Sequence, residues 1–420
     1  MSKLVRSPLF LMALTIFIDF TGFGLIIPLL PFWAQHLGAG PVGVGLTLTV
    51  YALAQFIFTP VLGRLSDRYG RKPVIFSSLL IEAISFAFTA LAGSLPLLLA
   101  ARFVGGLGAS NIGSAQAVVT DVTSPGERAR GMGLIGAAIG LGFVVGPALG
   151  GVLAPVGPTV PFWAAMGLAA INALLVMSFL PETRREKGKV SSGSRGSGGL
   201  LTGWGKTLRY PAVVRLVTIN LFFTLAFAAM EAVFPLFTQH TFGWTARENG
   251  YIFTYIGFVV VLMQGGLVGR LVRRFGEHAL LIAGLLMLAA GLILLPWSTN
   301  LALLFISLGI LSVGEGAVTP TVSALLSFVS PAEAQGETLG FAQGVAGLGR
   351  VAGPLVAGSL FAMAGPGSPF LIGGILVALA VVLALPALPV RREAEETQGR
   401  AEDTRKPERT TRILSRRVNV

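Results

Sequence analysis

Long apolar stretches alternate with short polar segments along this chain. Windows of about twenty apolar residues, the length that an α-helix needs to cross the hydrocarbon core of a bilayer, recur from one end to the other. The pattern predicts an all-α integral membrane protein with twelve transmembrane helices. They cover residues roughly 9–33, 42–62, 74–92, 95–121, 130–154, 160–180, 211–237, 249–268, 279–297, 301–328, 338–363 and 369–390.

The predicted helices fall into two halves. Residues 182–210 switch to Arg, Lys, Gly and Ser, a composition typical of a flexible linker. Three dipeptides recur after about 206 residues: Ser124-Pro125 at Ser330-Pro331, Gly63-Arg64 at Gly269-Arg270, and Gly146-Pro147 at Gly353-Pro354. We therefore predict two pseudo-symmetric six-helix halves at 1–181 and 211–390, a cytoplasmic linker at 182–210, and a disordered cytoplasmic tail at 391–420.

The amino-acid composition agrees with a membrane protein and limits the kinds of chemical site that the chain can form. Of 420 residues, 53% are apolar and 12% are charged, and the mean hydropathy is +0.78. The chain has no Cys, which excludes thiolate chemistry, and its three His residues do not have metal-site spacing. We expect no metal, no cofactor and no enzymatic activity.

The net charge of +12 comes mostly from cations on one side of the predicted helices. They occupy the N-terminus, the segments 63–73, 128–130, 182–215 and 270–274, and the tail, while Arg247 is left on the other side. Short cationic loops stay in the cytoplasm, so we predict cytoplasmic termini and a multi-pass protein of the cell (inner) membrane. Since these are loop charges beside lipid, no nucleic-acid partner is expected.

A cationic segment separates the second and third predicted helices. It reads Gly63-Arg64-Leu65-Ser66-Asp67-Arg68-Tyr69-Gly70-Arg71-Lys72-Pro73, and we predict a loop at the membrane surface. The segment resembles the Gly-x-Leu-x-Asp-Arg-x-Gly-Arg-Arg/Lys loop of the major facilitator superfamily. That resemblance implies a conformational latch made by Gly63, Asp67, Arg68, Gly70, Arg71 and Asp121. In the outward-open state Arg71 would pair with Asp121, and Asp67 would face the start of the eleventh helix, where the helix dipole favours a carboxylate.

Asp19 lies near the middle of the first predicted helix. A charge at this depth costs about 3 kcal/mol, so such residues usually face a cavity or a partner. The stretch from Asp19 to Pro31 resembles the first helix of tetracycline:proton exporters, which share its Asp, two Gly and two Pro. Two further acids of those exporters would align near Ser85 and Leu288, so tetracycline itself is not predicted as the substrate.

Arg102 in the fourth helix belongs to Arg102-Phe103-Val104-Gly105-Gly106, which resembles a second superfamily motif whose Arg is tied to proton handling. A pair with Asp19 would favour the charged carboxylate, and its separation would favour the protonated form. Counted from the outer helix ends, however, the two residues differ in depth by roughly 9 Å. Arg102 could instead cap backbone carbonyls of the first helix, and both arrangements stay open.

Residues 142–151 in the fifth helix match the Gly-x-x-x-Gly-Pro-x-x-Gly-Gly motif of the antiporter branch of this superfamily. Small residues let two helices approach at backbone distance, and a proline introduces a bend. We predict a bendable seam between the two halves. Its residues are Gly142, Gly146, Pro147, Gly150 and Gly151.

In this superfamily helices 1, 4, 7 and 10 line a central cavity. Four charged residues inside predicted spans fall on these helices, one on each: Asp19, Arg102, Glu231 and Glu315. The resemblance implies proton coupling by Asp19, Arg102 and Glu315, and substrate binding by Asp19, Glu231, Glu315, Phe23 and Phe227. Glu82 is expected on a peripheral third helix as a protonated, hydrogen-bonded group, and Arg350 receives no role.

The predicted function is secondary active transport, as proton-coupled efflux (antiport) of a drug-like or small amphipathic metabolite by alternating access. The expected partners are a small-molecule substrate, protons and the lipid bilayer, and we expect a monomer. Two alternatives stay open. One is a symporter or uniporter for a sugar or an organic anion, and the other is a membrane receptor or scaffold that transports nothing.

Overall fold

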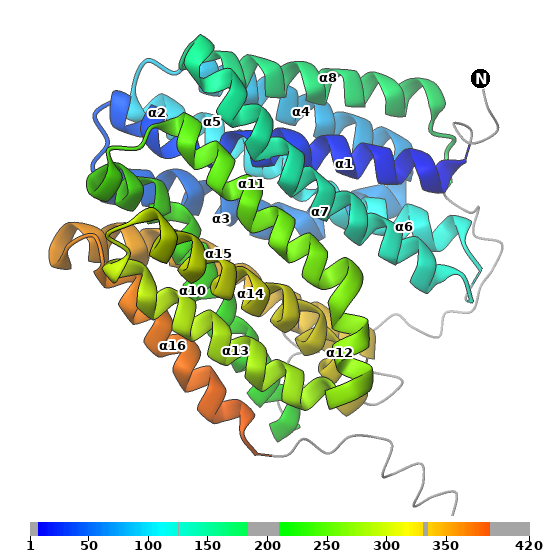
Figure 1. The fold of residues 1–420 in the computed structure, drawn as a ribbon. Coiled ribbons are helices and arrows are strands. Elements are labelled where there is room, and N and C mark those ends of the chain that lie inside the picture. Colours follow the sequence, from blue (N-terminus) through cyan, green and yellow to red (C-terminus); the bar gives the residue numbers. More distant parts are fainter. Residues whose placement is uncertain (1–6, 125, 184–209, 331–334, 387–420) are drawn as a thin grey trace, which may run out of the picture.

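The structure is a computed structural model, and it describes residues 7–124, 126–183, 210–330 and 335–386. The described residues form helices and turns without a strand (Figure 1). Eleven helical stretches are long and apolar enough to cross a membrane, and the twelfth predicted span forms a shorter apolar helix of 17 residues, Ser368–Ala384. The all-helical membrane fold is confirmed. The predicted linker and tail lie almost wholly outside the described residues.

The first half contains six membrane-crossing stretches, two of them interrupted. In chain order its helices are α1 (Pro8–Ile26), α2 (Leu30–His36), α3 (Pro41–Tyr69), α4 (Arg71–Leu91), α5 (Leu95–Gly108), η1 (Ala109–Asn111), α6 (Ile112–Val122), α7 (Arg128–Leu153), η2 (Ala154–Val156) and α8 (Val160–Phe179). The second half contains α10 (Pro211–Phe242), α11 (Ala246–Leu262), the π-helix η3 (Met263–Leu267), α12 (Val268–Phe275), α13 (Glu277–Leu294), η4 (Leu295–Trp297), α14 (Leu301–Val329), α15 (Gln335–Ala364) and α16 (Ser368–Ala384).

The first predicted span is divided into α1 and α2 by a turn at residues 27–29. Pro28 and Pro31 have no N–H group, so a continuous helix through them would lose backbone hydrogen bonds. The indole of Trp33 on α2 donates a 2.9 Å hydrogen bond to the Thr89 carbonyl of α4. This bond fixes the short helix to its own half of the molecule.

The segment at 63–73, predicted as a loop, is helical. α3 continues to Tyr69 and α4 starts at Arg71, with Gly70 between them at a φ of +110°. Only glycine adopts this φ at no steric cost, so Gly70 makes the corner possible. A helical backbone satisfies its own N–H and C=O groups close to lipid, while long cationic side chains reach the interface. The loop prediction is therefore wrong here.

The start of α4 is capped by an acid from far along the chain. Glu182 accepts hydrogen bonds from the backbone N–H groups of Arg71, at 2.9 Å, and Lys72, at 3.2 Å. The free N–H groups of a helix start attract a carboxylate, and the cations in this first turn oppose the helix dipole on their own. The equivalent helix of the second half, α13, carries its own acid, Glu277, in its first turn.

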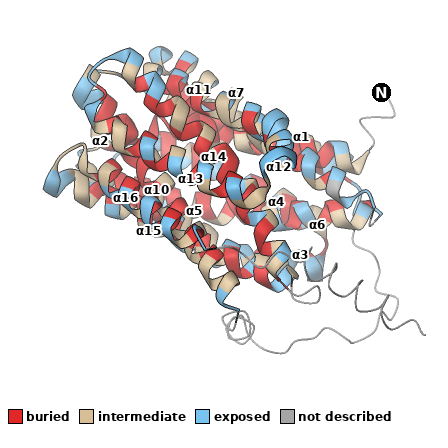
Figure 2. Ribbon diagram, turned by 60° about the horizontal axis from the view of Figure 1, so that its bottom comes forward, coloured by how far each residue is buried: buried red, intermediate tan, exposed pale blue. Residues whose placement is uncertain are grey.

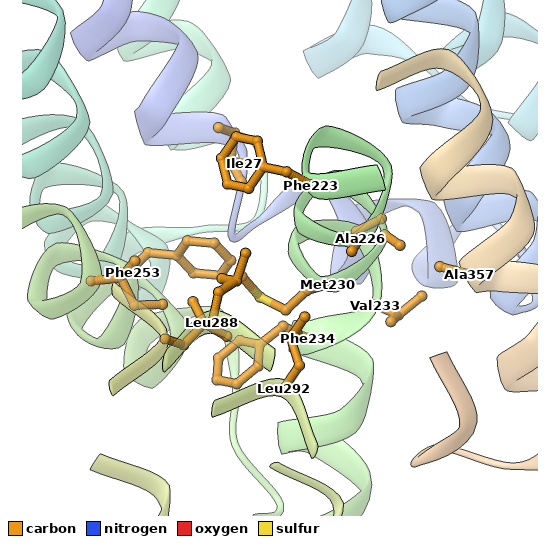
Figure 3. Close-up of a cluster of buried hydrophobic side chains, with 14 of the residues drawn as sticks. Ile27, Phe223, Ala226, Met230, Val233, Phe234, Phe253, Leu288, Leu292 and Ala357 are labelled. Carbon is orange, nitrogen blue, oxygen red and sulfur yellow. The ribbon is translucent and has the colours of Figure 1, made fainter. Parts of the chain in front are cut away.

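The two halves meet along two helix pairs, because α3 packs on α15 and α7 packs on α11. The backbone at Gly45 lies against the carbonyl of Pro354, and that at Gly250 lies against Gly151. A hydrophobic cluster also joins the halves (Figure 3). In it Phe234 of α10 contacts Phe253 of α11 with ring centroids 5.8 Å apart, and Ile27 comes from the turn after α1.

These contacts lie toward the end of the bundle that holds α2, which we call the opposite end. The other end, which we call the cationic end, holds the cations of segments 64–72, 128–130 and 270–274. There, a Cβ added at Gly133 of α7 or at Gly269 of α12 would meet no atom within 4 Å. In Figure 1, α7 and α12 stand apart at this end, on the side of the N-terminus. The two halves therefore diverge toward the cationic end.

Figure 2 shows exposed residues along the outer faces of the helices, and many of these exposed residues are large and apolar. Leu91 is 68% exposed and Leu174 is 63% exposed, although each lies in a membrane-spanning helix. Buried residues gather where helices face one another. This distribution suits a chain whose surroundings are lipid, so the informative residues are the polar ones inside.

Candidate functional site

Asp19 on α1 and Glu82 on α4 form a buried carboxyl pair. These residues are 8% and 2% exposed, and their side chains are within hydrogen-bonding reach of each other. Asn111 of η1 lies in reach of Asp19 as well. A hydrogen bond between two carboxyl groups requires a proton on one of them. The two carboxyl groups could therefore hydrogen-bond across α1 and α4 only when one of them is protonated.

Arg102 of α5 lies beside the pair and is 1% exposed. Its guanidinium carbon is 4.3 Å from the ring centroid of Tyr51 on α3, and its charge is within electrostatic range of Glu82. Tyr51 stacks on Phe23 of α1 with ring centroids 5.3 Å apart. In the described part of the chain, Nε and Nη1 of Arg102 have no hydrogen-bond partner. Arg102 can therefore bind a new acceptor without breaking an ion pair.

The structure decides between the two arrangements left open for Arg102 only in part. Asp19 and Arg102 both lie in the described part of the chain, and they form no ion pair. The carboxyl group whose charge acts on Arg102 is that of Glu82. Sequence reasoning kept Glu82 out of the site because it treated the third helix as peripheral. One signal was available: Ser78, Glu82 and Ser85 recur at helical spacing, which puts polar groups on one face of α4.

A second charged cluster lies in the other half. Glu231 on α10 and Glu315 on α14 are half-buried and within electrostatic range of each other. Arg350 on α15 is within range of Glu231 and is exposed although it lies mid-helix. Charged side chains this deep in a membrane span usually face the bundle interior or a water-filled cavity, and its electrostatic link to Glu231 indicates that Arg350 is directed inward. The four ionisable residues predicted to share one site are thus divided between two clusters, one in each half.

Aromatic side chains lie next to both clusters. Phe23 packs edge to face on Phe143 of α7, with ring centroids 6.1 Å apart, in addition to its contact with Tyr51. Phe227 stacks on Phe223, one turn away on α10, at 6.3 Å. Phe23 and Phe227 are both partly buried. They offer apolar surface beside the charges of the interior.

At the cationic end Arg71 contacts several polar groups. Its side chain pairs with Asp121 at 3.2 Å and with Asp67 at 2.7 Å, and it donates a 2.7 Å hydrogen bond to the Ser66 hydroxyl. The pair of Arg71 with Asp121 is expected for the outward-open state, but it is already formed in this conformation, in which the halves diverge at the cationic end. The Asp67 side chain is 62% exposed and binds Arg71 of its own half, so in this conformation it is not engaged by the eleventh helix.

The antiporter motif packs mainly inside the first half. A Cβ added at Gly146 would lie 2.6 Å from the Thr21 carbonyl oxygen, and one at Gly142 would lie 2.7 Å from Phe20 Cβ, both on α1. Gly151 instead faces α11 of the second half. Of the motif's glycines, Gly151 packs against the second half, whereas the glycines before it pack α7 against α1.

Comparison with known proteins agrees with this geometry. The profile of the family described as Major Facilitator Superfamily matches residues 12–281 and 265–420. The tetracycline resistance protein, class C, of Escherichia coli is 31% identical over 380 residues, which cover 89% of this chain and 94% of that protein. Multidrug resistance protein 2 of Bacillus subtilis is 31% identical over 385 residues, covering 88% and 92%.

A solved structure is similar as well. The crystal structure of the human organic anion transporter MFSD10 (TETRAN) aligns with a TM-score of 0.69 and 26% identity, over 91% of this chain and 100% of that one. The family match spans nearly all of the sequence, and the relatives are covered almost end to end. This chain belongs to the major facilitator superfamily and is a multi-pass membrane transporter.

Proposed function

We propose that this transporter exports a drug-like or small amphipathic compound in exchange for protons, by alternating access. The observation that carries the proposal is the buried Asp19–Glu82 carboxyl pair beside an Arg102 that has no ion-pair partner among the described residues. Such a group can change its charge when a proton arrives or leaves. The names of the relatives, tetracycline resistance protein and multidrug resistance protein, support export of such compounds.

The orientation follows from the charges. If the cationic end faces the cytoplasm, as the excess of Arg and Lys at that end favours, the termini are cytoplasmic and the chain crosses the inner membrane. The halves diverge at this end and touch near the opposite one. The conformation described here is then open to the cytoplasm. A substrate would enter there and leave after the halves tip the other way.

The proton would act through the charge of the carboxyl pair. With one proton shared, Asp19 and Glu82 hold each other across α1 and α4, and Arg102 stays on Tyr51. Loss of the proton leaves two carboxylates that repel each other and attract Arg102. Release of the proton would therefore move side chains between α1, α4 and α5, and this movement would link proton release to a tilt of the first half.

The substrate would contact the second cluster. Glu231 and Glu315 supply negative charge, Arg350 supplies one positive charge, and Phe23 and Phe227 supply apolar surface. A compound with a cationic group on an aromatic or aliphatic body fits this combination. Its binding would compete with protonation of the two glutamates, as antiport requires.

The latch and the antiporter motif would set the equilibrium between states. On closure of the cationic end, Asp67 would leave solvent and meet the N-terminus of α15, where the helix dipole favours a carboxylate. The glycines of α7 would keep α1 and α7 together as a unit while Gly151 follows α11. An imported proton that crosses about 100 mV supplies about 2.3 kcal/mol, enough to sustain roughly a fiftyfold gradient of a neutral substrate.

The central test is Asp19→Asn in proteoliposomes. The amide keeps hydrogen bonds but cannot release a proton, so we expect proton flux driven by a tetraphenylphosphonium gradient to disappear while binding of that cation persists. The matched control is Glu127→Gln, which removes an exposed carboxylate at the cationic end and should leave flux unchanged. Wild-type flux in Asp19→Asn would refute the proposed proton coupling.

A second candidate function is transport of organic anions. Two observations favour it: Arg350 lies within electrostatic range of Glu231, and the similar human structure is described as an organic anion transporter. Uptake into proteoliposomes of tetraphenylphosphonium, a zwitterionic fluoroquinolone and an arylacetate, each with and without a pH gradient, separates the two candidates. Preference for the arylacetate, with no response to the cation, would select the second.

A further inference from the structure

The first half contains an unusual number of buried polar atoms without hydrogen-bond partners. Among the described residues, they include side-chain atoms of Asp19, Glu82, Asn111, Arg102, Ser85, Thr15, Ser78, Ser114 and Asn172. Each of these residues is at most 8% exposed. A buried polar group without a partner costs about 1 to 3 kcal/mol, and native proteins therefore leave few of them dry.

Four of these residues form one layer, which we call the hydroxyl layer: Thr15 on α1, Ser78 on α4, Ser114 on α6 and Asn172 on α8. Each lies seven or eight residues from the end of its helix at the cationic end, or about 11 Å at 1.5 Å per residue. The Asn172 amide donates a 2.9 Å hydrogen bond to the Thr15 carbonyl, which ties α8 to α1 at this level. The layer is therefore assembled from four helices at a common depth.

The acid pair lies one helical turn above this layer. Thr15 precedes Asp19 by four residues, Ser78 precedes Glu82 by four, and Ser114 follows Asn111 by three. Residues at these spacings share a helix face, so the side chains of the layer point toward the same space as the carboxyl pair. Polar atoms thus continue from Asp19 and Glu82 toward the cationic end, inside one half of the molecule.

Buried hydroxyls elsewhere in this protein commonly make hydrogen bonds to the helix backbone. Thr47 donates to the Val44 carbonyl at 2.7 Å, and Ser312 donates to the Leu308 carbonyl at 2.7 Å. This back-bonding is the usual solution for Ser and Thr in a membrane helix. Thr15, Ser78 and Ser114 make no such bond in the structure, so their hydroxyl groups are available to another partner.

We propose that water molecules fill the space between the hydroxyl layer and the acid pair, and that they carry the transported proton away from Asp19 and Glu82. The inference rests on the proposed proton coupling. A buried water needs two to four polar partners, and the layer supplies three hydroxyls and the Asn172 Oδ1. Each water accepts one proton and passes one on. The pair ends with one proton fewer, and its next proton comes from the opposite end.

An apolar layer closes this space toward the cationic end. Leu11, Ile75 and Val118 lie three or four residues beyond the hydroxyl layer on α1, α4 and α6, and each is at most 2% exposed. Buried apolar side chains therefore separate the hydroxyl layer from the cationic end in this conformation. Protons pass to that end only when the apolar side chains part, which prevents a leak between transport cycles. The path lies inside the first half, separate from the charges that we assign to the substrate.

The first experiment is infrared difference spectroscopy between two pH values, recorded in H₂¹⁶O and H₂¹⁸O. It needs no substrate. We expect O–H stretching bands of weakly bonded internal water that shift in H₂¹⁸O and disappear in the triple variant Thr15→Val, Ser78→Ala, Ser114→Ala. The double variant Thr47→Val, Ser312→Ala, which removes satisfied hydroxyls, should keep them. Absence of such bands in the wild type would overturn the proposal.

The second experiment measures proton flux driven by a tetraphenylphosphonium gradient in proteoliposomes. The triple variant should bind the cation as the wild type does, and its flux should fall by about tenfold or more, as loss of a proton relay predicts. If no water fills this space, the same changes remove unpaired hydroxyls, so the variant becomes more thermostable. Its flux then stays unchanged, and that result refutes the water path. Asp19→Asn is measured in parallel. If Asp19→Asn loses flux but the triple variant keeps it, proton coupling stands and only the water path fails.

Discussion

At the scale of single residues, Glu82 and Arg102 change how the first half is understood. If Asp19 and Glu82 share a proton, as we propose, they form, next to an arginine without an ion pair among the described residues, a unit whose charge depends on that proton. Titration then belongs to the pair and not to Asp19 alone. Arg102, held on the Tyr51 ring, is the group that can respond to the change.

This unit makes Glu82 as necessary as Asp19. We expect Glu82→Gln to reduce substrate-driven proton flux by about a hundredfold, because the amide cannot share the proton, with little effect on substrate binding. Glu82→Asp, which restores the carboxyl group, should recover part of the flux. Flux is followed with a pH-sensitive dye inside proteoliposomes. Full flux in Glu82→Gln would assign the proton to Asp19 alone.

Arg350 gives a second prediction at this scale. Replacing Arg350 by Gln removes the positive charge beside Glu231, so affinity for the cation tetraphenylphosphonium should rise and affinity for an anionic arylacetate should fall. A change of about tenfold corresponds to about 1.4 kcal/mol. Arg350→Lys keeps the charge and serves as the control in equilibrium binding measurements. Equal changes for both probes would mean that Arg350 acts only on folding.

The residues of the site differ in how well sequence could find them. Asp19, Arg102, Glu231 and Glu315 stand out because a charge inside an apolar span is costly wherever it lies. Their grouping could not be predicted, because it depends on distances between helices. Glu82 was assigned to the periphery by its helix number alone, although its side chain turns inward against Asp19.

At the scale of helices, the glycines of α7 set how closely two elements approach. Gly142 and Gly146 bring the backbone of α7 against α1 at Phe20 and Thr21. The motif in the sequence correctly indicated close packing, but it did not identify the partner helix. The segment at 63–73 shows a related limit, since its charges suggested a loop while the backbone stays helical up to Gly70. Polar residues in a sequence therefore indicate where a chain reaches water, but they do not show where a helix ends.

Gly146→Ala tests the contact of α7 with α1. An added Cβ would lie 2.6 Å from the Thr21 carbonyl oxygen, so one helix must shift, and we expect a loss of about 1 to 3 kcal/mol in the free energy of unfolding. The control is Gly136→Ala on the same helix, where a Cβ would meet no atom within 4 Å. Thermal unfolding in detergent reports both. Equal stability of the two variants would show that α1 and α7 are not held at backbone distance.

At the scale of the whole molecule, the halves touch near the opposite end and diverge at the cationic end. The repeats in the sequence predicted two halves, and contacts between the first and last six stretches run mainly through α3 with α15 and α7 with α11. No repeat could predict which end is open, because the two states of a rocking transporter share one sequence and differ by a few kcal/mol. The two charged clusters also depart from the repeat. In the first half the charged residues lie on α1, α4 and α5, and in the second they lie on α10, α14 and α15.

The chain contains no Cys, so spin labels can be added without background. For labels at Gly133→Cys and Gly269→Cys we expect two distance populations at the cationic end. Asp67→Asn should shift them toward the longer distance by about 1 to 3 kcal/mol, because it weakens the closed state. Substrate affinity in each state should stay the same. Glu127→Gln is the control, and an unchanged distribution in Asp67→Asn would exclude the latch.

The cap on α4 has a practical consequence for dividing this protein into separately expressed pieces. Glu182 belongs to the first half in space, although it comes after the last helix of that half in the chain. A fragment cut at residue 180 would lack the carboxylate that holds the start of α4, whereas one cut after 183 would keep it. The second fragment brings its own acid, Glu277, and tolerates either cut. Coexpressed fragments should therefore reassemble only when the first extends past Glu182.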